Sequence, residues 1–426
     1  MSVTAGQVLD LRVEKAASGG RMIARHEGEV VLVAGAIPGE RVTARVTRAE
    51  KRVAFAETVE VLEPSADRRA RSGDPACGGC LYAFVSYPRQ LQLKSEIIRD
   101  AFARIGRIPV AGAIEVAGSP EREYRMRGRF HIHDGRPGFY REGTHELCDP
   151  RPTGQLLESS IDAVEAAVAS LAAQGLTVAS VELSENIAGA QRALHFELRD
   201  AAPPAGALER AAAAAGLTGC TARTSDATSH SAGDPIVSDP IAALTGGRVS
   251  SGGGLRRHPE AFFQANRFLI APLAVTVMDS VPPGTVLDLY AGVGLFSVAL
   301  AAADAGDITA VEGDPVSSRD LLRNAAAYPG RLRVIRSSVE AYLARSGRSA
   351  PQTLIVDPPR TGMSKEAAEA VAGAGAQRIV YVSCDTPTMA RDARRLLDAG
   401  YRLTSLEAFD LFPNTPHVEA VGVFER

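Results

Sequence analysis

The sequence predicts an α/β protein whose principal domain follows two smaller regions, and three patterns support this. From about residue 262 onward, strand-like segments alternate with helical ones, which is typical of a parallel sheet covered by helices. The strand-like segments are VLDLY (286–290), ITAVE (308–312), LRVI (332–335), TLIVD (353–357) and RIVYVS (378–383). Residues 5–63 hold short β-branched strands separated by glycine turns, which predicts a small barrel of the OB type. Between them, from about 120 to 258, strand-like pieces mix with alanine-rich helices, which indicates an α+β region.

Length and composition are ordinary for a globular protein. The chain has 426 residues, of which 45% are hydrophobic and 23% charged. No apolar run approaches the ~20 residues of a membrane span, and no secretory signal is visible at the N-terminus. We therefore expect a cytoplasmic protein that does not bind membranes. The net charge of −3 neither favours nor excludes nucleic-acid binding. An RNA enzyme with this net charge needs its positive charge concentrated on one face.

A glycine turn follows the first strand of the C-terminal half. The strand VLDLY runs into AGVG (291–294), and Gly292 and Gly294 let a ligand approach the backbone, as in Rossmann-like folds. Glu312 ends the next strand, where a carboxylate accepts hydrogen bonds from ribose hydroxyls. The turn is not GxGxxG and no pyrophosphate pocket is evident, so S-adenosylmethionine is favoured over NAD. The alternative is that the glycines serve only tight packing.

Three further positions have the chemistry of a catalytic site. Asp357 opens DPPR (357–360) at the end of a buried-looking strand, where open α/β sheets bind their ligands. Cys384 stands between a strand and a helix, and a helix N-terminus favours a thiolate. Glu419 opens the last apolar strand and can accept a proton if its environment tunes its pKa. The simpler alternatives are a strand-ending turn, a core cysteine and a solvated glutamate.

Five ordered motifs resemble the RNA uracil-5-methyltransferase family, many bacterial members of which carry an N-terminal TRAM module. The motifs are FFQANRF (262–268), DLYAGVGLFS (288–297), VDPPRTG (356–362), YVSCDTPTMARD (381–392) and DLFPNTPHVE (410–419). The resemblance spans essentially the whole chain. It departs from the family at Asp385-Thr386, where Asn-Pro is common, and at Leu295 and Ser338, where other members present different polar groups.

The resemblance implies a role for each residue type. Cys384 is the nucleophile that adds to uracil C6, which makes C5 reactive enough to take a methyl group, and Glu419 is the general base that removes the C5 proton. Phe262 or Phe263 lies near the target base, which must leave its stack. The residues implied for the S-adenosylmethionine site are Gln264, Tyr290, Gly292, Gly294, Glu312, Ser338 and Asp357.

The same reasoning divides the chain into three domains. Residues 1–63 form the TRAM or OB-like RNA-binding barrel, residues 74–86 and 116–258 the central α+β domain, and residues 87–115 and 259–426 the Rossmann-like methyltransferase domain. We expect a monomer.

The expected partner is RNA and not DNA. Arg125, Arg127 and Arg129 alternate as on one strand face and, with Arg136, Arg141 and the basic cluster at 68–71, are candidates for phosphate contacts. The alternative is a solvated charged face. Family members act on transfer RNA or 23S ribosomal RNA, and the TRAM-like module favours ribosomal RNA. The competing functions are a transfer-RNA enzyme, or an RNA-binding protein with a decayed catalytic half, which the presence of Cys384 and Glu419 disfavours.

The remaining cysteines raise the question of a metal. An odd total of five cysteines argues against a disulfide framework. Cys77 and Cys80 match the central pair of an iron–sulfur ligand set found in related enzymes. Ala70 occupies one expected ligand position, while the distant one falls near Thr153, with Cys148 close by. At most three of four thiolates remain, which leaves open a relic, a zinc site or a cluster with a substitute ligand.

Overall fold

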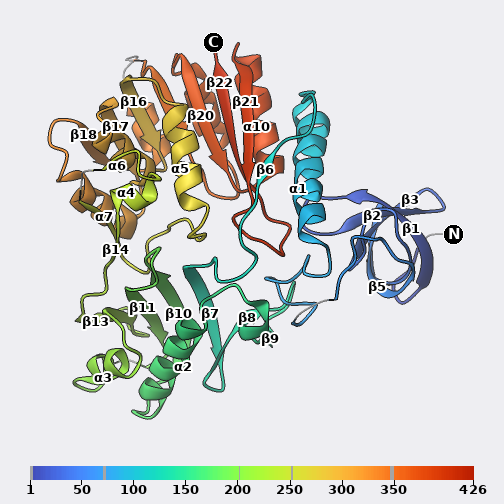
Figure 1. Cartoon of the computed structure of the whole chain (residues 1–426), viewed down its shortest axis with the longest axis horizontal. Helices are drawn as coiled ribbons and strands as arrows, with labels where there is room; N and C mark the ends of the chain where they lie inside the picture. Colours follow the sequence, from blue (N-terminus) through green and yellow to red (C-terminus); the bar gives the residue numbers. More distant parts are fainter. Residues whose placement is uncertain (1–2, 71–72, 201, 251–252, 346–349) are drawn as a thin grey trace.

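The amino-terminal strands close into a barrel, at the right of Figure 1. The computed structural model describes residues 3–70, 73–200, 202–250, 253–345 and 350–426. The barrel follows the order β1-β2-β3-β5-β4, and β1 pairs with both β2 and β4. Leu9, Leu11 and Val13 alternate into its interior because side chains of a strand point to opposite faces. The strands are β1 (Val8–Ala16), β2 (Met22–His26), β3 (Glu29–Ala34), β4 (Arg41–Ala49) and β5 (Val53–Glu63).

The central unit, at the bottom of Figure 1, is a mixed sheet with helices packed on one face. Its strand order is β13-β12-β11-β10-β7-β8-β9, and the apolar residues of α2 and α3 share one core with this sheet. The elements are β7 (Arg127–His133), β8 (Arg136–Tyr140), β9 (Leu147–Cys148), η2 (Arg151–Thr153), α2 (Glu158–Ala172), β10 (Val178–Glu185), β11 (Arg192–Leu198), α3 (Ala207–Ala214), β12 (Gly219–Arg223) and β13 (Ser229–Gly233).

The C-terminal domain is a doubly wound sheet in the order β18-β17-β16-β19-β20-β22-β21-β6. Strands β18 to β20 run parallel, and β22 enters antiparallel beside β20. The strands are β6 (Val116–Ala117), β16 (Gly284–Leu289), β17 (Gly306–Glu312), β18 (Leu332–Arg336), β19 (Thr353–Val356), β20 (Arg378–Ser383), β21 (Arg402–Phe409) and β22 (Glu419–Glu425). The sequence prediction of alternating strands and helices around a parallel sheet is confirmed.

Helices cover both faces of this sheet. Apolar residues of α5, α6 and α7 form a core against one face, and those of α1, η1, α9 and α10 form a core against the other. The helical elements are α1 (Tyr87–Ala101), η1 (Phe102–Gly106), α5 (Ile270–Asp279), α6 (Leu295–Ala302), α7 (Pro315–Ala325), α8 (Val339–Arg345), α9 (Lys365–Gly373) and α10 (Thr386–Asp398). In the described parts of the chain, no helix has the length and apolarity needed to span a membrane.

The boundary between the central and C-terminal units differs from the sequence prediction at two places. Strand β6 pairs with β21 and so extends the C-terminal sheet, although residue 116 was expected to open the central domain. The β14–β15 hairpin and the short helix between them pack into the C-terminal core through Ile241, Leu244 and Leu255. These elements are β14 (Val237–Pro240), α4 (Ile241–Leu244) and β15 (Gly254–Arg257). The partners of these elements lie far away in the sequence, so no pattern in the neighbouring residues could predict which domain they join.

A buried ion pair fixes α1 against the loop that precedes β22. The Lys94 ammonium contacts the Asp410 carboxylate, and neither side chain is exposed to solvent. Lys94 Nζ also donates to the Phe412 carbonyl at 3.2 Å. Burial lowers the pKa of Lys94 and raises that of Asp410, while each opposes the shift of the other. Because the loop leads directly to Glu419, this pair helps to place a candidate catalytic residue.

Replacing Lys94 with methionine should destabilise the protein by about 3–5 kcal/mol, because it leaves Asp410 buried without its partner. The matched control on the same helix is Arg89→Met, which removes a part-exposed pair with Glu96 and should cost at most about 1 kcal/mol. Chemical denaturation of both variants gives the two free energies of unfolding. An equal decrease in the free energy of unfolding for both variants would show that the buried pair stabilises the protein no more than the part-exposed pair.

Candidate active site

Strand ends bring the candidate catalytic residues together. Cys384 directly follows β20, and Glu419 is the first residue of β22. The two strands are antiparallel neighbours, and their register pairs Ser383 with Ala420. The next position along this register sets Cys384 beside Glu419. Asp357 follows β19, the parallel neighbour of β20, so its carboxylate reaches the same edge of the sheet.

The Cys384 thiol is held in its neutral form. Burial raises its pKa to about 12, and the nearby Glu419 carboxylate adds to the shift, while a hydrogen bond and the positive charge of Arg360 oppose it. We expected the N-terminus of α10 to favour the thiolate, whereas burial and the neighbouring side chains together raise the pKa of this thiol. The helix is capped by the Asp385 side chain, which accepts from Thr388 N at 2.9 Å. Burial is the largest cause of the raised pKa, followed by the charge of Glu419.

Buried carboxylates line the edge of the sheet beside the thiol. Burial raises the pKa of Asp288 to about 7 and, with the neighbouring charge of Asp288, that of Asp357 to about 8. Burial and Asp357 also raise the pKa of Glu419 well above its ordinary value, although Arg360 opposes this shift. Asp288 Oδ2 accepts from the Ser297 hydroxyl, whereas Oδ1 is buried with no hydrogen-bond partner among the described residues. Such a site suits a ligand that is cationic and donates hydrogen bonds.

The two glycines of the turn have different surroundings: Gly294 is closely packed, and Gly292 faces open space. A side chain at Gly294 would lie 2.6 Å from Leu321 Cδ1, so this glycine permits close packing of α6 on α7. A Cβ at Gly292 would meet no described atom within 4 Å, and its φ of +57° favours glycine. Glu312 Oε2 accepts from Gly292 N at 2.7 Å, which joins the turn to the end of β17. Tyr290, at φ 62°, begins the turn in the left-handed region.

The two phenylalanines of the FFQ segment have different surroundings. The Phe262 side chain is 60% exposed, and the Arg127 guanidinium lies 5.8 Å from its ring centroid. Phe263 is buried in the core, with the Arg257 guanidinium 4.0 Å from its ring. Only Phe262 of this pair presents a ring to solvent. Gln264 is buried next to them, whereas Ser338 is exposed and its Oγ accepts from Ala341 N at the start of α8.

Most of the arginines expected to contact RNA are engaged within the protein. Arg127 and Arg129 alternate on β7, and Arg125 lies just before this strand. Arg125 donates to Gln155 Oε1 at 2.8 Å, and Arg127 lies 3.6 Å from Glu182. Arg129 is the most exposed of the three, at 56% of its side chain. In the basic cluster, Arg68 pairs with Glu40 and Arg69 with Glu121, while Arg71 lies outside the described residues. Arg136 is exposed on β8, and Arg141 pairs with Asp74 and Glu146.

The cysteines of the central unit form a disulfide, contrary to the expectation from their odd number. Cys77 bonds to Cys148 across a Cα–Cα distance of 5.7 Å. Both flank β8: Cys148 pairs with Phe139, and Cys77 bridges to Arg141. Cys80 is buried beside them, its N–H donating to the Cys77 carbonyl.

These residues do not fit the iron–sulfur cluster or the zinc that remained open from the sequence. Two of the three sulfurs are bonded to each other, and thiolates are the required ligands. The Gln155 amide fills the space beside the cysteine pair, because a side chain on Gly79 would lie 1.7 Å from Gln155 Nε2. We therefore assign no metal to Cys77, Cys80 and Cys148.

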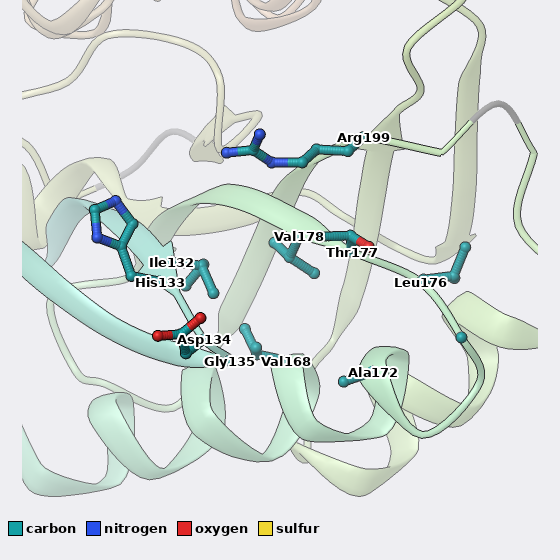
Figure 2. Close-up of a pocket in the computed structure, with 11 residues that line it drawn as sticks. Ile132, His133, Asp134, Gly135, Val168, Ala172, Leu176, Thr177, Val178 and Arg199 are labelled. Carbon is teal, nitrogen blue, oxygen red and sulfur yellow. The ribbon is translucent and has the colours of Figure 1, made fainter.

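Two features outside this edge were not foreseen from the sequence. His195, Glu197 and Glu260 approach within metal-binding distance of one another, but the Arg223 guanidinium already bonds to both carboxylates. A cavity of 720 Å³ lies in the central unit between α2 and the β7–β8 turn. Figure 2 shows the side chains that line it. This cavity contains none of the expected site residues. Arg360 was also missed as a site residue, although it stands in the DPPR segment that the sequence singled out.

Comparison with known proteins agrees with this architecture. A TRAM domain model matches residues 2–59, and a tRNA (uracil-5-)-methyltransferase model matches residues 345–426. An RNA methyltransferase of Streptomyces coelicolor is 32% identical, covering 99% of this chain and 93% of its own. The 23S rRNA (uracil(1939)-C(5))-methyltransferase RlmD of Alkalilimnicola ehrlichii is 31% identical, covering 96% and 94%, and that of Methylococcus capsulatus is 31% identical, covering 97% and 96%.

The whole fold is also similar to a solved structure. The tRNA (uracil-54, C5)-methyltransferase of Pyrococcus abyssi, in complex with S-adenosyl-L-homocysteine, superimposes with a TM-score of 0.75 at 22% identity, covering 98% of this chain and 100% of that one. The fold is thus that of a class I methyltransferase with an N-terminal TRAM barrel, as the sequence predicted. The chain belongs to the RNA uracil-5-methyltransferase family.

Alkylation of Cys384 by iodoacetamide should accelerate about tenfold per pH unit from about pH 7 to about pH 10, because only the thiolate reacts and the thiol pKa is about 12. Glu419→Gln should speed the reaction at pH values where Glu419 is ionised, since the substitution then removes a charge that raises this pKa. Mass spectrometry of the Cys384 peptide gives the rates, with fully buried Cys220 as the internal control. A rate plateau below about pH 9 would contradict the assigned environment.

Proposed function

We propose that this protein methylates C5 of a uridine in 23S ribosomal RNA, with S-adenosylmethionine as the methyl donor and Cys384 as a covalent nucleophile. The observation that supports this most directly is the register of β20 and β22, which sets Cys384 beside Glu419 at a buried edge. The pair matches a reaction that needs a nucleophile and a base on one substrate ring.

The cofactor site is proposed at the adjoining ends of β16, β17 and β19. Asp288, Glu312 and Asp357 would hold S-adenosylmethionine, with the open face of Gly292 admitting it. Bound there, S-adenosylmethionine supplies an electrophilic methyl group. Its positive charge matches carboxylates whose pKa values are raised by burial and by one another, because a nearby cation favours their ionised forms. Gln264, Tyr290, Gly294 and Ser338 remain expected members of this site.

The reaction is proposed to begin at the thiol. Arg360 hydrogen-bonds to Cys384 and favours the thiolate, which forms when the thiol releases its proton to solvent. The thiolate sulfur then adds to uracil C6 and moves electron density to C5 and O4. After C5 has gained its methyl group, the Glu419 carboxylate removes the C5 proton, the C5–C6 double bond re-forms and the thiolate leaves. Burial raises the pKa of Glu419, which strengthens this carboxylate as a proton acceptor.

Access to the target base is proposed at Phe262. An exposed aromatic ring with a guanidinium beside it offers a stacking surface for a base taken out of its helix. Of the expected arginines, Arg136 on β8 is exposed and Arg129 keeps 56% of its side chain exposed, so these two are available to a phosphate.

Glu419→Gln should accumulate a covalent complex with ordinary uridine RNA, because the methylated adduct cannot lose its C5 proton. Cys384→Ala should form none, and Cys220→Ala should behave as the unaltered enzyme. Denaturing gels with labelled RNA, followed by mass spectrometry of the Cys384 peptide, measure the complex. If Glu419→Gln turns over normally, the base is a different residue.

The choice between RNA classes is tested with 5-fluorouridine, since fluorine at C5 blocks the final proton removal. Two relatives that cover nearly the whole chain are named as 23S rRNA enzymes, which supports ribosomal RNA. Incubation with S-adenosylmethionine and 5-fluorouridine-substituted 23S or transfer RNA should leave the Cys384 adduct on the ribosomal RNA. An adduct on transfer RNA alone would make this a transfer-RNA enzyme, and its absence from both, in folded protein, would favour a binding role.

A further inference from the structure

A cavity of 680 Å³ lies between α7 of the C-terminal domain and the adjoining strands of the central unit. Its polar lining comes from three elements that are distant in sequence: β12, the segment from 234 to 258, and α7. The polar side chains that line it are Thr221, Asp234, Arg256, His258, Arg319 and Arg323. None of them belongs to the site at Cys384.

Three guanidinium groups converge on this cavity. Arg319 and Arg323 stand four residues apart and therefore share one face of α7, while Arg256 comes from β15. All three are exposed. Arg319 makes no ion pair or side-chain hydrogen bond with any residue that the structure describes. Burial and the neighbouring charges of Arg319 and Arg323 lower the pKa of His258 to about 4, so this imidazole is neutral and leaves the arginines as the cationic groups.

The carboxylates near these arginines leave most of their donors available. Asp234 lies 3.7 Å from Arg256, and Asp320 lies 3.6 Å from Arg323, both beyond hydrogen-bond distance. The Arg256–Asp234 pair is exposed on both sides, and such pairs contribute little free energy. Asp320 is buried below the cavity, where its Oδ2 accepts from His258 N at 2.7 Å. It therefore anchors the backbone rather than occupying the space above the arginines.

The cavity is joined by hydrogen bonds to the proposed catalytic region. Asn324 of α7 accepts from Arg256 N at 3.0 Å and donates to the Val293 carbonyl at 2.9 Å, in the turn that contains Gly292. Six residues after Arg256, the same segment presents the exposed ring of Phe262. A strand held at the cavity would thus be fixed relative to both the glycine turn and Phe262.

We propose that Arg256, Arg319 and Arg323 bind a backbone phosphate of the RNA strand that carries the target uridine. This rests on the proposed function, in that the substrate is RNA. Guanidinium groups suit this ligand because their donors form paired hydrogen bonds with phosphate oxygens. The site supplies positive charge that the engaged arginines Arg125 and Arg127 do not.

The test is filter binding of the full-length protein to a 23S ribosomal RNA transcript over a range of salt concentrations. Arg319→Ala and Arg319→Ala/Arg323→Ala should weaken binding several-fold and make the slope of log K against log salt shallower by about one. The matched control is Arg402→Ala, an exposed arginine on β21 without a described ion pair. Arg319→Lys/Arg323→Lys should keep most of the salt slope, because it retains the charge.

The outcomes separate this site from the proposed function. A shallower slope in the alanine variants, with Arg402→Ala unchanged, supports the phosphate site. If all variants match the unaltered protein while that protein still forms the 5-fluorouridine adduct, the site is overturned and the proposed function stands. If the unaltered protein neither binds the transcript nor forms an adduct with either RNA, both are overturned. Circular dichroism of each variant establishes that any change is not unfolding.

Discussion

Burial of like charges at one edge of the parallel sheet is the constraint on which the site depends. Asp288, Asp357 and Glu419 lie in a desolvated region next to Cys384, and Arg360 is the cation that offsets them at the thiol. This arrangement raises the pKa of each group above its ordinary value, and so favours the protonated forms of groups that the proposed reaction needs ionised. A cationic cofactor would reverse that balance, because an opposite charge favours carboxylates over carboxylic acids. The carboxylates of the site are therefore arranged to be ionised when a cationic cofactor is bound.

The rest of the molecule holds this edge in place through contacts between distant segments. The Lys94–Asp410 pair ties α1 to the loop before Glu419, and the Gln90 amide donates to Asn414 Oδ1 in the same loop at 2.9 Å. On the other side, Asn324 joins α7 to β15 and to the glycine turn. Loops that would otherwise move are thus fixed by buried polar groups, whose partners are costly to remove.

The sequence predicted the type of site better than its electrostatics. The barrel, the α/β domain and the family were predicted correctly, because period and turn chemistry are local and the motifs are ordered along the chain. The raised pKa of Cys384 could not be predicted from the local sequence, since burial and the charges of Glu419 and Asp357 come from other strands. Two of the three expected RNA-facing arginines, Arg127 and Arg129, alternate on β7. Glu182 and Gln155 contact Arg127 and Arg125 from elsewhere in the central unit, which the alternation could not show.

The sequence by itself determined the order of the domains, the strand that each candidate residue ends or begins, and the family, because these depend on neighbours along the chain. Only the tertiary structure decided which of those residues meet. The antiparallel pairing of β22 with β20 places Glu419 beside Cys384. The disulfide between Cys77 and Cys148 argues against the metal site that the cysteines had suggested. The tertiary structure also brings Arg256, Arg319 and Arg323 together around one cavity. Burial, pKa and convergence of charge depend on distance in space, which no window of sequence contains.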